Sequence, residues 1–103
     1  MNAALIEALT MPKLGLTMKE GTVAAWHVSP GTAVSPGQPV LDVETEKVTH
    51  ECEAQAAGVL RRQVAREGAV LPVGALVGVI APAEVSESEI DRFVAGFQPE
   101  KQV

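Results

Sequence analysis

With 103 residues, the chain is long enough for one domain with a hydrophobic core and too short for two domains of ordinary size. Hydrophobic residues make up 47% and aromatic residues only 3%, so aliphatic side chains must fill the core, and with frequent Gly and Pro they favour short strands joined by tight turns. The net charge of −5 argues against nucleic acid or an anionic membrane surface as a partner.

The compartment is predicted from three further features. Cys52 is the only cysteine, which excludes an intramolecular disulfide and fits a reducing cytoplasm. The first residues lack the basic start of a signal peptide. The longest uncharged run, 68–83, is too short for a membrane span and contains Pro72 and Pro82. We therefore expect a cytoplasmic domain that does not cross a membrane.

Short apolar segments bounded by Pro and Gly predict a chain made mostly of strands. The expected strands are 7–11, 22–28, 32–34, 40–45, 48–53, 59–64, 70–71 and 76–80. Segments 40–45 and 48–53 form a hairpin whose tip, Glu46 and Lys47, carries an amine into solvent. Two-residue tips favour residues that tolerate positive φ, and neither of these does so readily. A local rule broken at an exposed tip indicates a functional position.

A repeat underlies this order. A shift of 37 positions superimposes glycines at expected turns: Gly21 on Gly58, Gly31 on Gly68 and Gly37 on Gly74. The same shift superimposes apolar positions of expected strands: Val23 on Leu60, Val34 on Leu71, Val40 on Val77 and Val43 on Ile80. Two copies of one unit predict two similar sheets that face each other about a pseudo-twofold axis. Only the first copy continues into Glu46 and Lys47.

After Pro82 the pattern changes to that of a helix. Ser86 and Glu89 fit a capping box, and apolar residues then recur at helical spacing up to Phe97. The sequence predicts one amphipathic helix over 87–95 with Gly96 near its end. Whether it packs on the strands or leads to another domain stays open. The expected division is a domain at 1–84, the helix at 85–97 and a tail or start of a linker at 98–103.

Three segments carry a family resemblance: MPKLG at 11–15, MKEG at 18–21 and DVETEKV at 42–48. In this order they resemble the lipoyl domains of 2-oxo acid dehydrogenase complexes, over roughly residues 10–82. Segments 60–65 and 71–76 are similar to those of the acyltransferase components of acetoin dehydrogenase complexes.

The resemblance implies an all-β flattened barrel, a barrel-sandwich hybrid of two four-stranded antiparallel sheets with pseudo-twofold symmetry. It also implies that Lys47 carries lipoate in amide linkage, attached by a lipoate ligase or lipoyl transferase. Such a carrier shuttles acyl groups from a thiamine-dependent dehydrogenase to an acyltransferase core, and dihydrolipoamide dehydrogenase reoxidises it. The domain itself is then a carrier and not an enzyme, and whether the parent chain is an acyltransferase stays open.

Recognition by partners is expected at residues around Lys47. The resemblance assigns this role to Leu14, Gly15 and Glu20 of the first loop. On the hairpin the candidates are Glu44, Glu46 and Val48, and Glu51 extends the acidic rim. The family usually has Asp where Glu46 stands, which keeps the charge and adds one methylene.

Three other interpretations stay open or are disfavoured. Biotinyl domains share the fold but place Met on both sides of their lysine, unlike Glu46 and Val48. An unmodified interaction module, with Lys47 as a mere surface charge, remains an alternative of another class. No metal or catalytic constellation is expected, because His27 and His50 show no ligand spacing. We expect Cys52 to be a small core residue and Trp26 to pack at the edge of the core.

Overall fold

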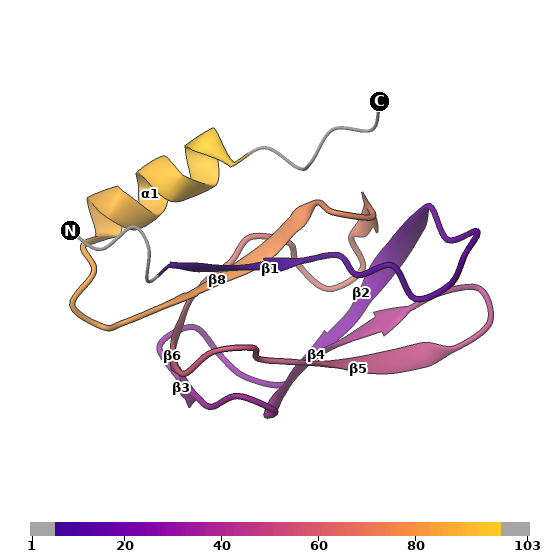
Figure 1. The fold of residues 1–103 in the computed structure, drawn as a ribbon, viewed down its shortest axis with the longest axis horizontal. Coiled ribbons are helices and arrows are strands. Elements are labelled where there is room, and N and C mark those ends of the chain that lie inside the picture. Colours follow the sequence, from indigo (N-terminus) through magenta and orange to yellow (C-terminus); the bar gives the residue numbers. More distant parts are fainter. Residues whose placement is uncertain (1–5, 98–103) are drawn as a thin grey trace.

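The computed structural model describes residues 6–97 and shows two four-stranded antiparallel sheets and one helix (Figure 1). One sheet has the strand order β1-β8-β6-β3 and the other β5-β4-β2-β7. The elements are β1 (Glu7–Thr10), β2 (Glu20–Trp26), β3 (Ala33–Val34), β4 (Pro39–Glu44), β5 (Thr49–Glu53), β6 (Gly58–Gln63), β7 (Val70–Pro72), β8 (Leu76–Ala81) and α1 (Glu87–Gly96). The predicted all-β class, the strands and the helix are confirmed, with boundaries that differ by at most two residues.

The two halves of the chain are equivalent pairing by pairing. Val23 pairs with Val43 across β2 and β4, and 37 positions later Leu60 pairs with Ile80 across β6 and β8. Both pairings contain a bulge at the same place, after Val23 and after Leu60. The predicted repeat is therefore a repeat of hydrogen-bond register as well as of residue type.

The short strands are exchanged between the halves, which the sequence did not predict. β3 belongs to the first half but pairs with β6, and β7 belongs to the second half but pairs with β2. The turns that permit the exchange contain Gly31 and Gly68, whose φ angles are +94° and +93°. Residues with a Cβ atom rarely adopt this backbone conformation, so glycine is required there. The Gly31 N–H donates to the carbonyl oxygen of Leu60, and the Gly68 N–H to that of Val23, both at 2.7 Å.

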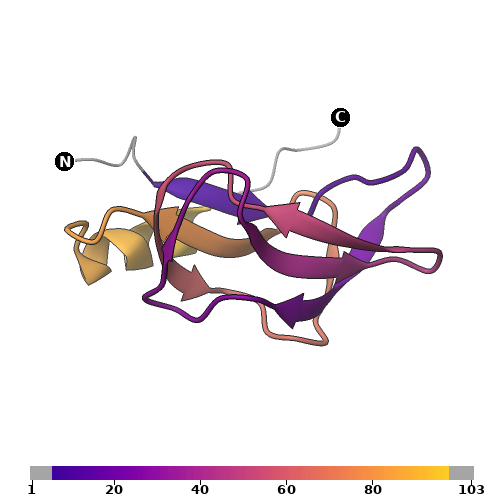
Figure 2. The ribbon, with the colours of Figure 1, turned by 90° about the horizontal axis from the view of Figure 1, so that it is seen from below.

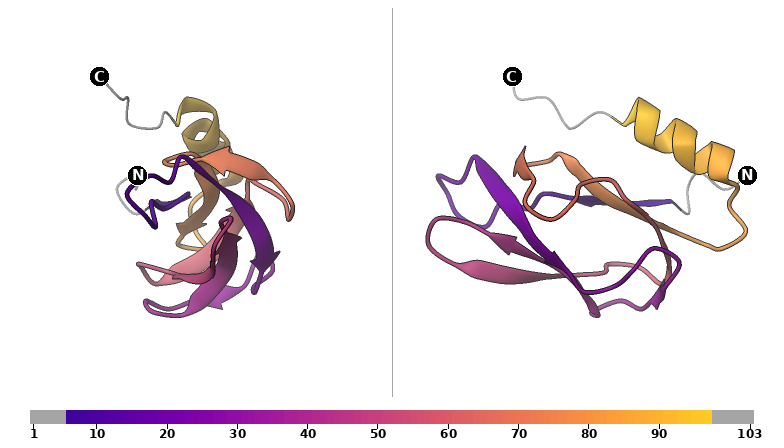
Figure 3. Two further views of the ribbon diagram at one scale, coloured as in Figure 1. Left: turned by 90° about the vertical axis from the view of Figure 1, so that its right-hand side faces the viewer. Right: turned by 180° about the vertical axis from the view of Figure 1, so that it is seen from behind.

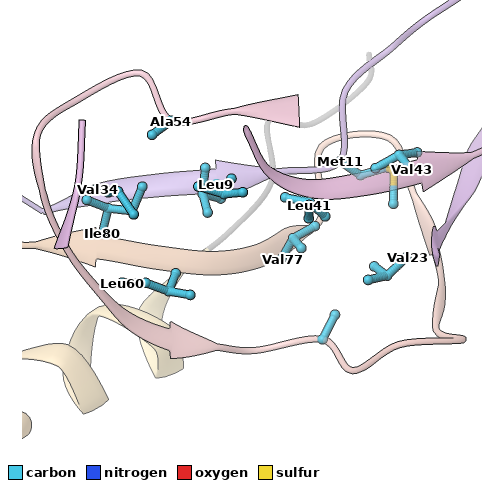
Figure 4. Packing of buried hydrophobic residues seen from close by; sticks show 12 residues of the cluster. Leu9, Met11, Val23, Val34, Leu41, Val43, Ala54, Leu60, Val77 and Ile80 are labelled. Carbon is cyan, nitrogen blue, oxygen red and sulfur yellow. The ribbon is translucent and has the colours of Figure 1, made fainter. Parts of the chain in front are cut away.

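The core lies between the inner faces of the two sheets and is aliphatic (Figure 4). Buried side chains from equivalent positions, such as Val23 and Leu60, contribute to the same cluster. Trp26 packs at its edge and donates its indole N–H to the Ala65 carbonyl at 2.9 Å. At the equivalent position Gln63 donates to the carbonyl of Val28, also at 2.9 Å. These two side chains therefore hydrogen-bond the halves to each other in a symmetric way.

Helix α1 covers the outer face of the sheet that contains β8 (Figure 3). Ile90 is buried there against Val79, Ala81 and Val85. A shift of 37 places Asp42 and Glu44 at the positions of Val79 and Ala81 on the other sheet. Charge at these outward positions keeps that sheet open to solvent, whereas apolar residues require a cover. The helix that the sequence left unplaced thus packs on the strands.

Two arginines on β6 hold the first turns of α1. Arg61 donates to Glu87 at 2.8 Å and Arg62 donates to Glu87 at 3.0 Å and to Asp91. The hydrogen bonds from Arg61 and Arg62 lower the pKa of the Glu87 carboxyl. The Ser86 hydroxyl accepts from the Glu89 N–H at 3.1 Å, as the predicted N-cap requires. No helix within residues 6–97 is long and apolar enough to span a membrane.

Candidate functional site

The two halves differ most in two segments, and both lie at one end of the molecule. Strand β1 maps onto β5 with a shift of 43, because Glu7 pairs with Ile80 as His50 pairs with Val43. The segment from Thr10 to Gly21 is therefore six residues longer than the equivalent segment from Glu53 to Gly58. The second difference is residues 45–48, which join β4 to β5, whereas β8 and β1 are not joined in this way. Figure 2 shows both segments at the end of the molecule away from α1.

Lys47 lies at the tip of the β4–β5 hairpin. Its side chain is exposed, and residues 6–97 provide no ion-pair partner for its amino group. Strand β4 fixes the base of the hairpin, because Leu41 and Val43 are buried in the core. At the tip, the Thr45 N–H donates to the Val48 carbonyl oxygen at 2.8 Å. The site is thus an exposed amine on a two-stranded support that is anchored in the core.

The longer loop, residues 11–19, is anchored by side chains that point inward. Met11 is buried, and Leu14 and Met18 pack against the core. The Leu14 N–H contacts the Met18 sulfur at 3.1 Å. A side chain at Gly21 would approach Met11, Met18 and Val43 within about 3 Å, so the absence of a side chain permits this close packing. The loop is therefore pinned in place, and this leaves Leu16 94% exposed.

A groove of about 1010 Å³ separates this loop from the hairpin tip. All seven residues predicted for the site line it: Leu14, Gly15, Glu20, Glu44, Glu46, Lys47 and Val48. Leu14 differs from the others because it also packs on the core. Glu51, in contrast, faces the outer side of the sheet and does not line the groove.

The structure adds apolar residues to the groove that the sequence analysis did not select. Leu16, Val70 and Val48 are 94%, 55% and 48% exposed, and all three line the groove. Among residues 6–97 only one other large apolar side chain, Val64, is comparably exposed. Val70 reaches the site because β7 is exchanged onto the sheet of the hairpin, which sequence distance alone does not indicate. An exposed apolar lining beside an amine is typical of a recognition surface.

Comparison with known proteins identifies the fold and the family. The model of a biotin/lipoyl family, described as "Biotin-requiring enzyme", matches residues 7–80. The chain belongs to the biotinyl/lipoyl-attachment family. The solution structure of the lipoyl domain of the 2-oxoglutarate dehydrogenase complex from Azotobacter vinelandii is 36% identical, with a TM-score of 0.61. The match covers 72% of this chain and 94% of that domain, so the likeness lies on the lipoyl side of the family.

Curated relatives are longer members of the lipoyl group. The dihydrolipoyllysine-residue acetyltransferase component of the acetoin cleaving system from Cupriavidus necator is 58% identical over 87% of this chain and 24% of its own length. That of Pseudomonas putida is 53% identical over 92% of this chain and 26% of its own length. The chain spans about a quarter of these relatives. A long-chain acyl-CoA carboxylase, 19% identical with a TM-score of 0.62, shares the fold.

The lipoyl-type domain has a second polar cluster on the outer face of the β5-β4-β2-β7 sheet. His27 hydrogen-bonds to Asp42 at 2.8 Å, and ligand atoms of His27, Asp42 and Glu51 lie within 4.8 Å of one another. The hydrogen bond to Asp42 raises the pKa of His27. His27 directly follows β2, Asp42 lies on β4 and Glu51 on β5, so no local spacing in the sequence indicates the cluster. Their type and separation would suit a divalent cation, but His27 already has a hydrogen-bond partner in Asp42.

The two remaining candidates are separated from this cluster. His50, which the sequence analysis considered beside His27, lines the groove instead. Cys52 is half-buried against the core, and burial raises the pKa of its thiol. A thiol kept protonated by an apolar environment is a poor nucleophile. Cys52 therefore packs as the small core residue that was expected.

Proposed function

We propose that this lipoyl domain is a covalent carrier and that Lys47 bears lipoate in amide linkage. The observation that carries the proposal is the position of Lys47 at the tip that has no counterpart in the other half of the molecule. The side chain is exposed and free of an ion pair within the described residues, so a modifying enzyme can reach it. Within residues 6–97, no other lysine lies at the tip of a hairpin of two consecutive strands.

The protein's own contribution is position and recognition. Lipoate, when bound, supplies the dithiolane that accepts an acyl group and two reducing equivalents. The hairpin holds the attachment nitrogen away from the core, and the anchored loop fixes the opposite wall of the groove. A tethered carrier makes each transfer effectively intramolecular, which raises the local concentration without new contacts.

The proposed setting is an acetoin or 2-oxo acid dehydrogenase complex in the cytoplasm. Relatives named as acetyltransferase components of the acetoin cleaving system and of pyruvate dehydrogenase complexes support it. The partners are then a thiamine-dependent dehydrogenase, an acyltransferase core, dihydrolipoamide dehydrogenase and a lipoate ligase or lipoyl transferase. The higher identity to the acetoin components favours acetoin.

Partner recognition is proposed for the residues that line the groove. Glu44, Glu46 and Val48 present charge and one apolar side chain on the hairpin. Gly15 contributes from the loop and Glu20 from the first position of β2, and Leu14 acts by anchoring the loop. Leu16 joins this set because the anchored loop presents it to solvent. Desolvated apolar contacts at the centre of such a surface contribute most of the binding free energy.

Intact mass after incubation with a lipoate ligase, ATP and lipoate tests the proposal. The wild-type domain should gain one lipoyl group, and Lys47→Arg should gain none. Lys19→Arg, which removes the other lysine of the groove, is the matched control and should be modified like the wild type. Lipoylation of Lys47→Arg would refute the site. Biotinylation by a biotin ligase without lipoylation would favour the biotin carrier, and no modification by either would favour the unmodified interaction module.

A further inference from the structure

The hairpin tip turns without the left-handed residues that such tips normally use. Tight two-residue tips normally use left-handed residues, because these match the twist of the strands. Glu46 and Lys47 occupy the tip, yet no residue other than glycine has a positive φ within residues 6–97. The backbone bond from the Thr45 N–H to Val48 closes one side of the turn. The N–H groups of Lys47 and Val48 have no backbone acceptor within residues 6–97.

The Thr45 side chain supplies that acceptor. Its hydroxyl oxygen accepts from the Lys47 N–H at 3.3 Å and from the Val48 N–H at 3.2 Å. The hydroxyl also donates to the Val48 carbonyl oxygen at 3.2 Å. A hydroxyl has one donor and two acceptor lone pairs, so its entire hydrogen-bonding capacity is used inside the tip. The side-chain oxygen thereby replaces the backbone carbonyl that a left-handed turn would use.

We propose that Thr45 is a positioning residue for the modification of Lys47: its hydroxyl fixes the tip in the conformation that the lipoate-attaching enzyme recognises. The inference rests on the proposed function of Lys47. The Thr45 hydroxyl bonds to backbone groups of Lys47 and Val48, so it acts through the backbone of the tip and not on the reacting amine.

A tip without this hydroxyl is expected to sample several conformations. The enzyme would then bind only the fraction of molecules with an ordered tip, which weakens apparent affinity in proportion. The loss should therefore appear in KM more than in kcat. Ser retains all three hydrogen bonds, whereas Val keeps the shape of Thr and loses them all. The pair Thr45→Ser and Thr45→Val thus separates the hydroxyl from side-chain volume.

Steady-state lipoylation of the whole 103-residue chain tests the inference. We expect Thr45→Val to raise KM about fivefold or more, with kcat changed less than about twofold. Thr45→Ser should restore KM to within about twofold of wild type. Thr49→Val is the matched control, since the Thr49 hydroxyl makes no hydrogen bond within residues 6–97, and it should behave like wild type. A wild-type KM for Thr45→Val would overturn the inference.

Amide hydrogen exchange on the unmodified domain gives a second test that does not depend on lipoate. Exchange at Lys47 and Val48 should accelerate about fivefold or more in Thr45→Val and return in Thr45→Ser, with core amides unchanged. Unchanged exchange at both amides would overturn the role of the hydroxyl even if Lys47 is lipoylated. If the wild type takes no lipoate, the proposed function fails, and positioning for modification fails with it, while the exchange result still decides whether Thr45 orders the tip.

Discussion

Replacing Ile90 by Ala tests whether α1 is an integral part of the folded domain. Ile90 is fully buried between α1 and the outer face of the sheet, against Val79, Ala81 and Val85. Truncating a buried Ile to Ala typically costs about 2–5 kcal/mol, and the cost grows with the cavity that remains. This cluster is small and lies near the surface, so partial collapse is possible. We therefore expect a loss of about 2–3 kcal/mol.

The assay is two-state chemical or thermal unfolding followed by circular dichroism. For a domain of this size the expected loss corresponds to a midpoint about 10–20 °C lower. Leu16→Ala is the matched control, because Leu16 is 94% exposed and its truncation should change stability by less than about 0.5 kcal/mol. A loss below about 1 kcal/mol for Ile90→Ala would refute the reasoning, since α1 would then separate from the strands at little cost.

Three further predictions follow from named contacts. His27→Gln should destabilise the domain by less than about 1 kcal/mol at pH 5.5 and by less still at pH 8.5. The reason is that the raised pKa of His27 gives stability that is present below pH 6.5 and lost as the imidazole deprotonates. Denaturant unfolding of mutant and wild type at both pH values checks this, and an equal loss of stability at the two pH values contradicts it. Gly78→Ala should lower the free energy of unfolding by about 1–3 kcal/mol, because the new Cβ would lie 2.9 Å from a backbone oxygen and from Trp26. Gly15→Ala is the control and should leave stability unchanged, because a Cβ at Gly15 would meet no atom within 4 Å. Equal effects of the two substitutions would argue against close packing at Gly78. Glu46→Asp should be lipoylated at least as fast as wild type, and slower modification would contradict the account of the tip.

Much of the fold was predictable because the backbone requires particular residue types at equivalent positions of the two repeats. Gly31 and Gly68 are needed for left-handed turns, so their spacing of 37 carries the symmetry into the sequence. The alternation of apolar residues fixed which faces of the strands are buried. The capping residue Ser86 likewise marked the helix start through a local hydrogen bond. These features depend on neighbours in the chain, and local patterns report them well.

Features that depend on distant pairing were not predictable in the same way. Val70 enters the groove only because β7 pairs with β2. The His27 cluster forms across three strands, and no spacing along the chain indicates it. The apolar outward residues Val79 and Ala81 indicate that another element packs on this face. This becomes apparent only when they are compared with the charged residues Asp42 and Glu44 at the equivalent positions. The exposure of Leu16 could not be predicted without knowing that Leu14 and Met18, on either side of it, pack against the core.

The exchange of β3 and β7 has a consequence for how the molecule moves. Each sheet is completed by a strand from the other half, so neither half can separate or unfold without breaking the other. Hinge bending between the two sheets is therefore not available to this domain. Under the proposed function, the barrel itself stays stiff, and movement of the carried group between active sites comes from the lipoyl-lysine arm and from residues outside the two sheets.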